Sequence, residues 1–258
     1  MSNIISVKDE SEFRNLIYEF LALESSSITY APEVDDLYHL YSLVRRKLVT
    51  SVLEYGSGWS SLAIHVGLLE NRASFAQEFE GVVRHPNLFQ HLIIDADERF
   101  LNITLQRLNK LKSDCQIIPI SADCEVVNDT VANWNYLPNF VADLVYVDGP
   151  DDNQIKGNFK NWTYGGNFTT PIFEDLITLE PYFWPESLIV FDGRTAHARY
   201  VKNKFRRNWN FMHDPFGDRS IFRLDEPPFG EVSAEFLKIR LQCTRLTSGK
   251  EKPEYLRN

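Results

Sequence analysis

Short apolar segments recur through the middle of the chain and alternate with stretches of helical spacing. The segments are 51–56, 91–96, 115–121, 142–150 and 186–194. Helical patterns follow the first two, at 60–70 with Ser60 as the expected N-cap and at 97–111 with Asp97 in that position. Apolar runs of strand length that alternate with helices are typical of a parallel sheet covered on both faces. The sequence therefore predicts an α/β fold with a doubly wound, mostly parallel sheet.

Segments on either side of this region predict further elements. Residues 9–23 and 33–46 carry apolar side chains at helical spacing, so we expect two amphipathic helices before the sheet. A basic helix is expected at 197–207, and 208–226 has the pattern of two strands around a Pro-Phe-Gly-Asp turn, an antiparallel hairpin at the C-terminal edge of the sheet. We predict an N-terminal helical cap over 1–48, one domain over 49–244 and a polar tail over 245–258.

The composition excludes several classes of protein. A hydrophobic content of 43% is enough for a substantial core, and the formal net charge of −9 argues against a general nucleic-acid binder. The N-terminus lacks the pattern of a secretory signal, and no apolar run is long enough to span a membrane. The three cysteines are too scattered to indicate a disulfide framework or a zinc site. We therefore expect a cytoplasmic protein.

A turn with two glycines follows the first apolar segment, in LEYGSGWSS at 53–61. Such a turn brings the backbone close to a ligand, which is a dinucleotide, a phosphate or a methyl donor in different proteins. Ser61 stands where the dinucleotide fingerprint has a third glycine, and no Lys-Ser/Thr pair follows as in a phosphate-binding loop. Glu54 would repel a diphosphate. The turn favours a methyl donor, with an NAD(P)-dependent oxidoreductase or a non-catalytic relative as the alternatives.

Acidic residues stand at or just past the end of each predicted strand: Glu54, Asp95, Asp123, Asp148 and Asp192. Because the carboxyl ends of parallel strands meet at one edge of a sheet, we expect these side chains to converge on one cleft. Asp95 is placed to accept the hydroxyls of a ribose, and Asp123 to meet the exocyclic amine of an adenine. Each acid taken alone is equally compatible with a turn or a helix cap.

These motifs together resemble those of the class I S-adenosylmethionine-dependent methyltransferases. The resemblance rests on Glu54-Tyr55-Gly56-Ser57-Gly58, IIDAD at 93–97, SAD at 121–123 and LVYVDGP at 144–150. It covers roughly residues 50–225 and implies a Rossmann-like methyltransferase fold with S-adenosyl-L-methionine as cofactor. The implied cofactor contacts are Glu54, Gly56, Ser57, Gly58, Ser60, Asp95, Ala96, Asp123 and Asp148. The interval from Gly58 to Asp95 exceeds the usual ~20 residues, so 71–90 are expected to be an insertion or an extended helix plus loop.

Candidate catalytic residues follow the last two parallel strands. Methyl transfer requires an aligned nucleophile and removal of its proton, and Asp148, Asp192 and His197 are the candidates for these tasks. His197 has the side chain whose ordinary pKa is nearest neutral, although a solvent-exposed histidine in the first turn of a helix is an equal alternative. Asp148 and Asp192 would also suit a divalent cation. Gly193 stands where metal-dependent catechol-type O-methyltransferases have an Asn, so a metal is not favoured.

The acceptor is expected to be a small molecule or a sugar. The loop 153–171, which includes Tyr164, is rich in Gly, Asn and aromatic residues that suit a polyhydroxylated ligand, or it is an ordinary surface loop. Arg194 and Arg199 begin a basic stretch and are placed to meet an anionic group of the substrate. VDGPDD differs from the Asn/Asp-Pro-Pro-aromatic motif of enzymes that methylate nucleic-acid bases, so we predict O-methylation and no nucleic-acid partner. LEYGSGWSS, VYVDGP and IVFDGRTAHARY together resemble bacterial methyltransferases associated with sugar or polysaccharide modification.

Overall fold

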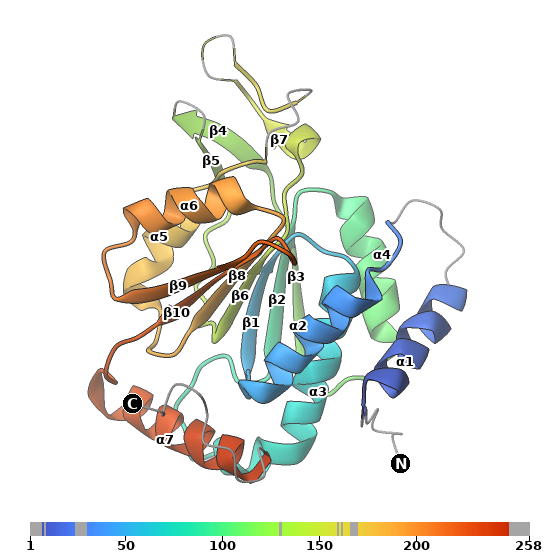
Figure 1. The fold of residues 1–258 in the computed structure, drawn as a ribbon, viewed down its shortest axis with the longest axis vertical. Coiled ribbons are helices and arrows are strands. Elements are labelled where there is room, and N and C mark those ends of the chain that lie inside the picture. Colours follow the sequence, from blue (N-terminus) through green and yellow to red (C-terminus); the bar gives the residue numbers. More distant parts are fainter. Residues whose placement is uncertain are drawn as a thin grey trace.

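A seven-stranded sheet forms the centre of the computed structural model, which describes residues 7, 9–23, 30–128, 131–158, 160, 162–165 and 170–247 (Figure 1). The strand order is β3-β2-β1-β6-β8-β10-β9. The parallel strands are β1 (Ser51–Tyr55), β2 (Gln90–Asp95), β3 (Gln116–Ser121), β6 (Leu144–Val147) and β8 (Leu188–Asp192). The hairpin of β9 (Trp209–Asp214) and β10 (Arg219–Leu224) runs antiparallel to β8. The predicted mostly parallel sheet with a C-terminal antiparallel hairpin is confirmed.

Helices cover both faces of this sheet. One face packs against α5 (Asp175–Leu179) and α6 (Thr195–Lys204), with Leu53, Tyr55 and Val145 in the shared core. The other face packs against α2 (Val34–Arg46), α3 (Trp59–Phe79) and α7 (Gly230–Thr247), with Val52 and Leu144 among the core residues. Neighbouring residues of a strand point to opposite faces, so runs that are apolar at every position supply both cores.

The two helices expected before the sheet are present. They are α1 (Glu10–Ala22) and α2, and they share a core with α3 and α4 (Glu98–Asn109). Phe13 and Ile17 of α1 and Tyr41 of α2 are buried there against Leu62 of α3. The proposed division of the chain into a cap, a central domain and a tail stays a prediction.

The structure corrects one expected helix cap and confirms another. Ser60 is the second residue of α3 and not its N-cap, because Gly58 takes that position. Asp97 caps α4, accepting a hydrogen bond of 2.8 Å from the backbone N–H of Arg99. α3 continues to Phe79, with Phe75 and Phe79 one turn apart and both buried. The long interval before β2 is therefore an extended helix plus loop.

Some elements were not expected from the sequence. A small second sheet has the order β5-β4-β7 and consists of β4 (Cys124–Asn128), β5 (Val131–Trp134) and β7 (Ile155–Lys156). Short 3-10 turns lie at Asp152–Gln154 and Glu180–Tyr182. α7 continues past the start of the tail predicted at residue 245, and 248–258 lie outside the described residues.

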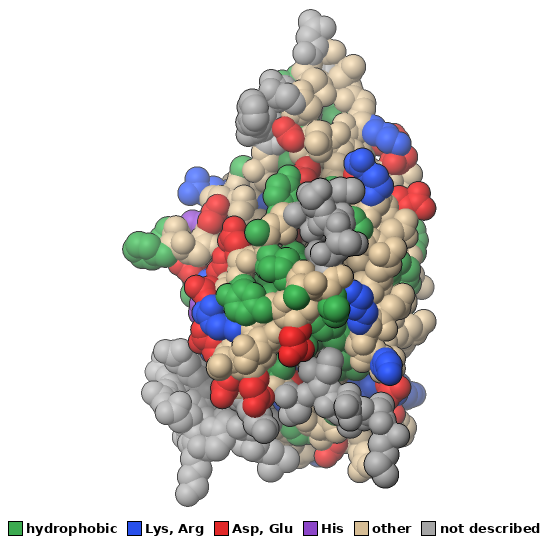
Figure 2. Space-filling model, turned by 90° about the vertical axis from the view of Figure 1, so that its right-hand side faces the viewer, with side chains coloured by type: hydrophobic (Ala, Val, Ile, Leu, Met, Phe, Trp, Pro, Cys, Tyr) green, Lys and Arg blue, Asp and Glu red, His purple; other side chains and the backbone are tan. Residues whose placement is uncertain are grey.

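Figure 2 shows the face that lies at the right of Figure 1, where Lys and Arg side chains stand singly or in small groups among acidic and hydrophobic ones. Within the part of the chain that the structure describes, no helix is long and apolar enough to cross a membrane. Cys115, Cys124 and Cys243 are buried free thiols.

Candidate functional site

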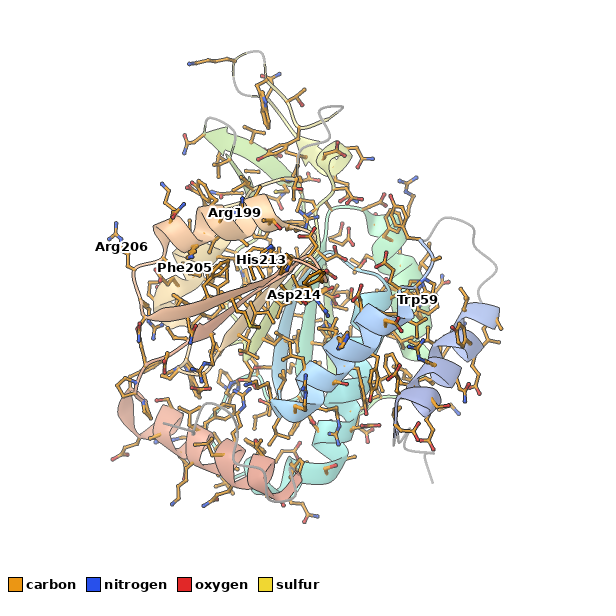
Figure 3. The ribbon with its side chains drawn as sticks, in the orientation of Figure 1. Trp59, Arg199, Phe205, Arg206, His213 and Asp214 are labelled. Carbon is orange, nitrogen blue, oxygen red and sulfur yellow. The ribbon has the colours of Figure 1, made fainter. Side chains whose placement is uncertain are left out.

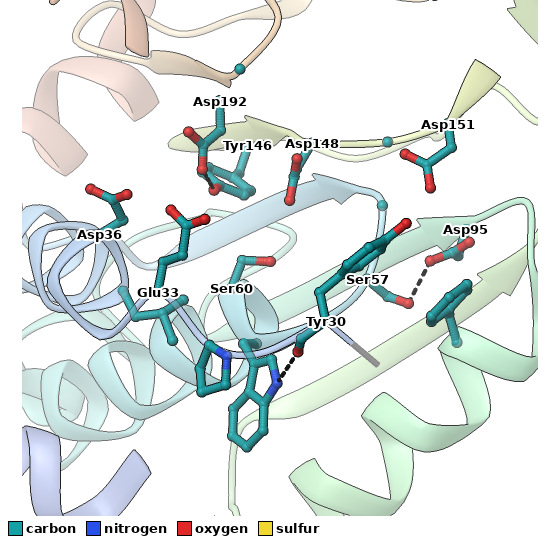
Figure 4. Close-up of a pocket in the computed structure, with 18 of the residues that line it drawn as sticks. Tyr30, Glu33, Asp36, Ser57, Ser60, Asp95, Tyr146, Asp148, Asp151 and Asp192 are labelled. Carbon is teal, nitrogen blue, oxygen red and sulfur yellow. Dashed lines mark hydrogen bonds between the residues drawn. The ribbon is translucent and has the colours of Figure 1, made fainter. Parts of the chain in front are cut away.

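The glycine turn after β1 lines a cavity of about 440 Å³. The cavity lies at the C-terminal edge of the parallel strands, where Asp95 ends β2, Asp192 ends β8 and Asp148 follows β6. Glu33 and Asp36 face these strands from the start of α2 (Figure 4). The carboxylates that line it are Glu33, Asp36, Asp95, Asp148, Asp151, Asp192 and Asp218, and its aromatic residues are Tyr30, Trp59, Phe100 and Tyr146. The structure thus brings acids from neighbouring strands into one cavity.

Two glycines allow the turns after β1 and β6 to touch. Gly56 has a φ of +90°, in the left-handed region that other residues rarely adopt. A Cβ added at Gly56 would lie 2.6 Å from the backbone N of Gly149, and one added at Gly149 would lie 2.5 Å from the Cα of Gly56. Gly58 differs, because a Cβ there would have no atom within 4 Å. Gly56 and Gly149 are therefore required for packing, whereas Gly58 keeps space open in the cavity.

Glu54 lies beneath the turn and does not line the cavity. Its side chain is fully buried, and Oε1 accepts a hydrogen bond of 2.7 Å from Ser60 Oγ in the first turn of α3. Its Oε2 lies 2.9 Å from Nε2 of His91 on β2. Glu54 thus supports the turn from behind, and its expected contact with the cofactor stays a prediction. His91 was missed from the sequence, where a histidine inside an apolar strand gives no signal of its partner.

Asp95 and Ser57 form the end of the cavity next to β2. Ser57 Oγ donates a hydrogen bond to Asp95 Oδ2, and the backbone N–H of Asp97 donates one of 2.7 Å to Oδ1. Burial raises the pKa of Asp95. The arrangement leaves the carboxylate fixed at the edge of the cavity, where hydroxyl donors of a ligand would compete with Ser57.

Two of the other predicted cofactor contacts lie outside the cavity lining. Ala96 packs partly buried against the core. Asp123 is in the loop between β3 and β4, and its carboxylate forms a partly exposed ion pair of 2.6 Å with Lys156 Nζ. A contact between Asp123 and an adenine therefore stays a prediction, and in this arrangement Lys156 competes for the carboxylate.

Tyr146 is a cavity residue that sequence reasoning missed. It stands on β6 two positions before Asp148, and its hydroxyl donates a hydrogen bond to Asp192 Oδ2. Burial raises the pKa of Tyr146 well above its ordinary value and also raises the pKa of Asp192, an effect that the Tyr146 hydrogen bond partly offsets. The uncharged hydroxyl thus holds one oxygen of the Asp192 carboxylate.

The start of α2 was also not expected to reach the site. Trp59 Nε1 donates a hydrogen bond of 3.2 Å to the backbone oxygen of Tyr30, which places the segment before α2 against the glycine turn (Figure 4). A hydrogen bond with Asp36 and the nearby charge of that group raise the pKa of Glu33. This segment adds two more carboxylates to the cavity.

Arg194 supports the cavity from behind. It is buried, and its Nη2 donates hydrogen bonds of 2.6 Å to the backbone oxygen of Asp148 and 2.8 Å to that of Pro150. The guanidinium therefore fixes the loop after β6, and the expected contact of Arg194 with a substrate anion stays a prediction. Arg199 lies on α6 and Arg206 follows this helix. Both side chains are exposed and lie outside the lining of the cavity, whereas Trp59 belongs to the lining (Figure 3).

His197 does not reach the cavity. It is fully buried beneath α6 between the rings of Phe173 and Phe191, and its Nε2 lies 2.8 Å from the backbone oxygen of Phe173. Burial lowers the pKa of His197 to about 3. Both sequence interpretations, a base facing the cleft and an exposed histidine, are corrected, because the third residue of α6 faces the sheet.

A second cavity of about 370 Å³ adjoins the first. The two share Asp148, Asp151, Asp192 and Gly193, and the second adds Asp152, Thr170, Pro171 and Arg194. Tyr164, the other predicted substrate contact, is buried, and its hydroxyl accepts a hydrogen bond of 3.0 Å from the Ile172 N–H instead of lining either cavity. Residues 159, 161 and 166–169 of the predicted sugar-binding loop lie outside the described residues.

Asp148 lies where the two cavities meet. Its side chain is open to the cavity, but the surrounding protein desolvates the carboxylate and raises its pKa to about 7; the charge of Arg194 opposes this shift and that of Asp192 adds to it. Among the described residues, no group of three or more His, Cys, Asp or Glu side chains is arranged to hold a metal ion. The carboxyl group of Asp148 therefore keeps its proton to a higher pH than an ordinary aspartate does.

This pKa predicts a pH dependence of stability. The folded protein binds the Asp148 proton more tightly than the unfolded chain does. Protonation of Asp148 therefore stabilises the folded protein at low pH, and this contribution is lost as the pH rises through about 7. We expect the free energy of unfolding of the wild type to fall relative to that of Asp148→Asn between about pH 5 and about pH 8. Urea unfolding of both proteins across this range measures the difference. A constant difference would mean that Asp148 titrates as in the unfolded chain.

A solved methyltransferase structure has a similar arrangement of the chain. No family model matches the sequence, and no curated protein was found to be related to it. The SAH-bound methyltransferase PaMTH1 of Podospora anserina is similar with a TM-score of 0.52 and 12% identity, over 87% of this chain and 91% of that one. The O-methyltransferase TomG of Streptomyces achromogenes has a TM-score of 0.44 and 12% identity, over 87% and 92%. The chain therefore has a methyltransferase-like α/β fold, similar to that of the Podospora anserina enzyme.

Proposed function

We propose that the protein is an S-adenosylmethionine-dependent methyltransferase. The observation that carries this proposal is the first cavity, which joins the glycine turn to carboxylates at the ends of β2, β6 and β8. The methyl donor has a cationic sulfonium, an ammonium group and a ribose with two hydroxyls. Carboxylates suit all three, and the likeness in fold to a SAH-bound methyltransferase supports the same ligand.

Specific residues fit specific parts of this cofactor. Asp95 would accept the ribose hydroxyls, with Ser57 giving up its hydrogen bond. The first backbone N–H groups of α3, at Trp59 and Ser60, suit the carboxylate of the cofactor, because the first turn of a helix leaves these donors without partners. Asp148 would lie near the cationic groups. When bound, the cofactor supplies an electrophilic methyl group.

The alternative nicotinamide cofactor fits this cavity less well. A dinucleotide carries a diphosphate, which binds bare backbone N–H groups or basic side chains. Among the described residues that line the first cavity there is no Lys or Arg, and its charged side chains are all acidic. A diphosphate at the glycine turn would therefore face repulsion from Asp95 and Asp148.

The second cavity is proposed as the place of the acceptor. It meets the first at Asp148 and Asp192, so a nucleophile there would lie next to the bound methyl donor. Asp148 is the proposed general base, because its raised pKa of about 7 suits removal of a proton from a hydroxyl near neutral pH. The wall contains Asp, Thr and Arg side chains but no aromatic ring among its described residues. This chemistry favours a small polyhydroxylated acceptor such as a sugar over a planar phenol.

The test is transfer of a labelled methyl group from S-adenosylmethionine across a panel of sugars, phenols and amines. We expect transfer to a hydroxyl of a polyhydroxylated compound, and a loss of about 100-fold or more in the rate of transfer in Asp148→Asn at saturating cofactor. Asp225→Asn, at an exposed carboxylate outside both cavities, is the matched control and should keep full activity. Transfer to phenols alone would contradict the proposed acceptor, and cofactor binding without transfer to any compound would favour a non-catalytic relative.

A further inference from the structure

Glu54 connects three elements that meet at the glycine turn. It lies on β1 two residues before Gly56, and both carboxylate oxygens are occupied: Oε1 by the Ser60 hydroxyl of α3 at 2.7 Å and Oε2 by His91 of β2 at 2.9 Å. The side chains of Glu54 and His91 have no exposed surface. A buried carboxylate without such partners would be strongly destabilising. The Glu54 carboxylate must therefore keep both partners, and these two bonds hold it in one position.

His91 reaches Glu54 because of the strand register. β1 and β2 pair in parallel with Val52 opposite His91 and Glu54 opposite Ile93, so Glu54 and His91 are diagonal neighbours on one face of the sheet. α3 packs on that face, and His65 of α3 stacks on His91 with ring centres 5.8 Å apart. Burial lowers the pKa of His65 to about 3, so this neighbour is uncharged. His91 is therefore held between the sheet and α3 with its Nε2 directed at Glu54.

The Glu54 carboxylate in turn fixes the start of α3. Ser60 lines the cavity together with Gly56, Ser57 and Gly58, whereas Glu54 and His91 do not. A shift of the carboxylate would release the first turn of α3 and with it the backbone N–H groups that face the cavity. We propose that His91 is a positioning residue of the cofactor site: by holding Glu54, it sets the glycine turn for binding without touching the ligand.

The inference rests on the proposed function, because S-adenosylhomocysteine is the probe. Its dissociation constant is measured by calorimetry for the wild type, His91→Phe and His91→Gln, with thermal unfolding of each protein. His91→Phe keeps a ring and removes the bond to Glu54, and we expect affinity to fall about tenfold. His91→Gln restores a donor within reach of Glu54 and should bind within about twofold of the wild type.

His85 supplies a matched control at the opposite edge of the sheet. It is also a buried histidine beside a carboxylate, with Nε2 3.9 Å from Oδ1 of Asp143, which precedes β6. His85→Phe should alter stability and leave the dissociation constant within about twofold of the wild type. Equal affinities for His91→Phe and the wild type would overturn the inference, and so would equal losses in His91→Phe and His85→Phe.

A double-mutant cycle with Ser60 separates this role from general destabilisation. Ser60→Ala removes the other bond to Glu54, so Ser60→Ala and His91→Phe should have non-additive effects on affinity. Additive losses would show that the two side chains act independently and would overturn the inference. If His91→Phe does not fold, His91→Leu, which also removes the bond to Glu54, takes its place in the cycle with the same expectations. Failure of the wild type to bind S-adenosylhomocysteine would instead count against the proposed function.

Discussion

Gly56→Ala is expected to lower the free energy of unfolding by about 3 kcal/mol or more. The added Cβ would lie 2.6 Å from the Gly149 backbone N and 2.8 Å from its Cα, and these are backbone atoms at the meeting point of two turns. The φ of +90° at Gly56 adds strain for any residue with a Cβ. Urea unfolding monitored by circular dichroism measures the loss.

Gly58→Ala is the matched control for this prediction. Its φ of 175° is extended backbone that any residue adopts, and a Cβ there meets no atom within 4 Å. We expect its stability to stay within about 1 kcal/mol of the wild type. Gly149→Ala should resemble Gly56→Ala, because its Cβ would lie 2.5 Å from Gly56 Cα. Similar stabilities for the Gly56 and Gly58 variants would mean that the turns after β1 and β6 do not pack as described.

Gly58→Arg is expected to weaken S-adenosylhomocysteine binding by about 100-fold or more while the protein stays folded. The open space around a Cβ at this position belongs to the cavity, so a long side chain would occupy the volume that the cofactor needs. Calorimetry gives the affinity, and thermal unfolding shows that the fold is retained.

Gly165→Arg introduces the same side chain at another glycine with no atom near its Cβ position. Gly165 lines neither cavity, so this variant should bind like the wild type. Undiminished binding by the Gly58 variant would place the ligand elsewhere on the protein and refute the assignment of the first cavity.

The centre of the sheet was predictable because β1, β6 and β8 are apolar at most positions. β1 and β6 are buried along their whole lengths, and this gives a sequence pattern that loops rarely imitate. The small sheet gives no such signal: β4 is mostly exposed, with Glu125 and Asn128 among its residues, and β7 has only Ile155 and Lys156. These strands depend on pairing with one another, which local sequence does not encode.

The site was predictable where backbone topology alone determines position. Asp95, Asp148 and Asp192 meet because parallel strands end at one edge. His197 was misplaced because the direction of a side chain in the first turn of a helix depends on how that helix is rotated against the sheet. Tyr30 and Glu33 reach the cavity through packing of α2 on α3, a tertiary contact between segments that no local motif links.

Calorimetric titration of the wild-type protein with S-adenosylhomocysteine, alongside NADH, tests the central claim most directly. The glycine turn and its carboxylates predict one-site binding of S-adenosylhomocysteine with a dissociation constant on the order of micromolar, and no measurable binding of NADH. Binding of NADH without binding of S-adenosylhomocysteine would contradict the assignment of the cavity to a methyl donor.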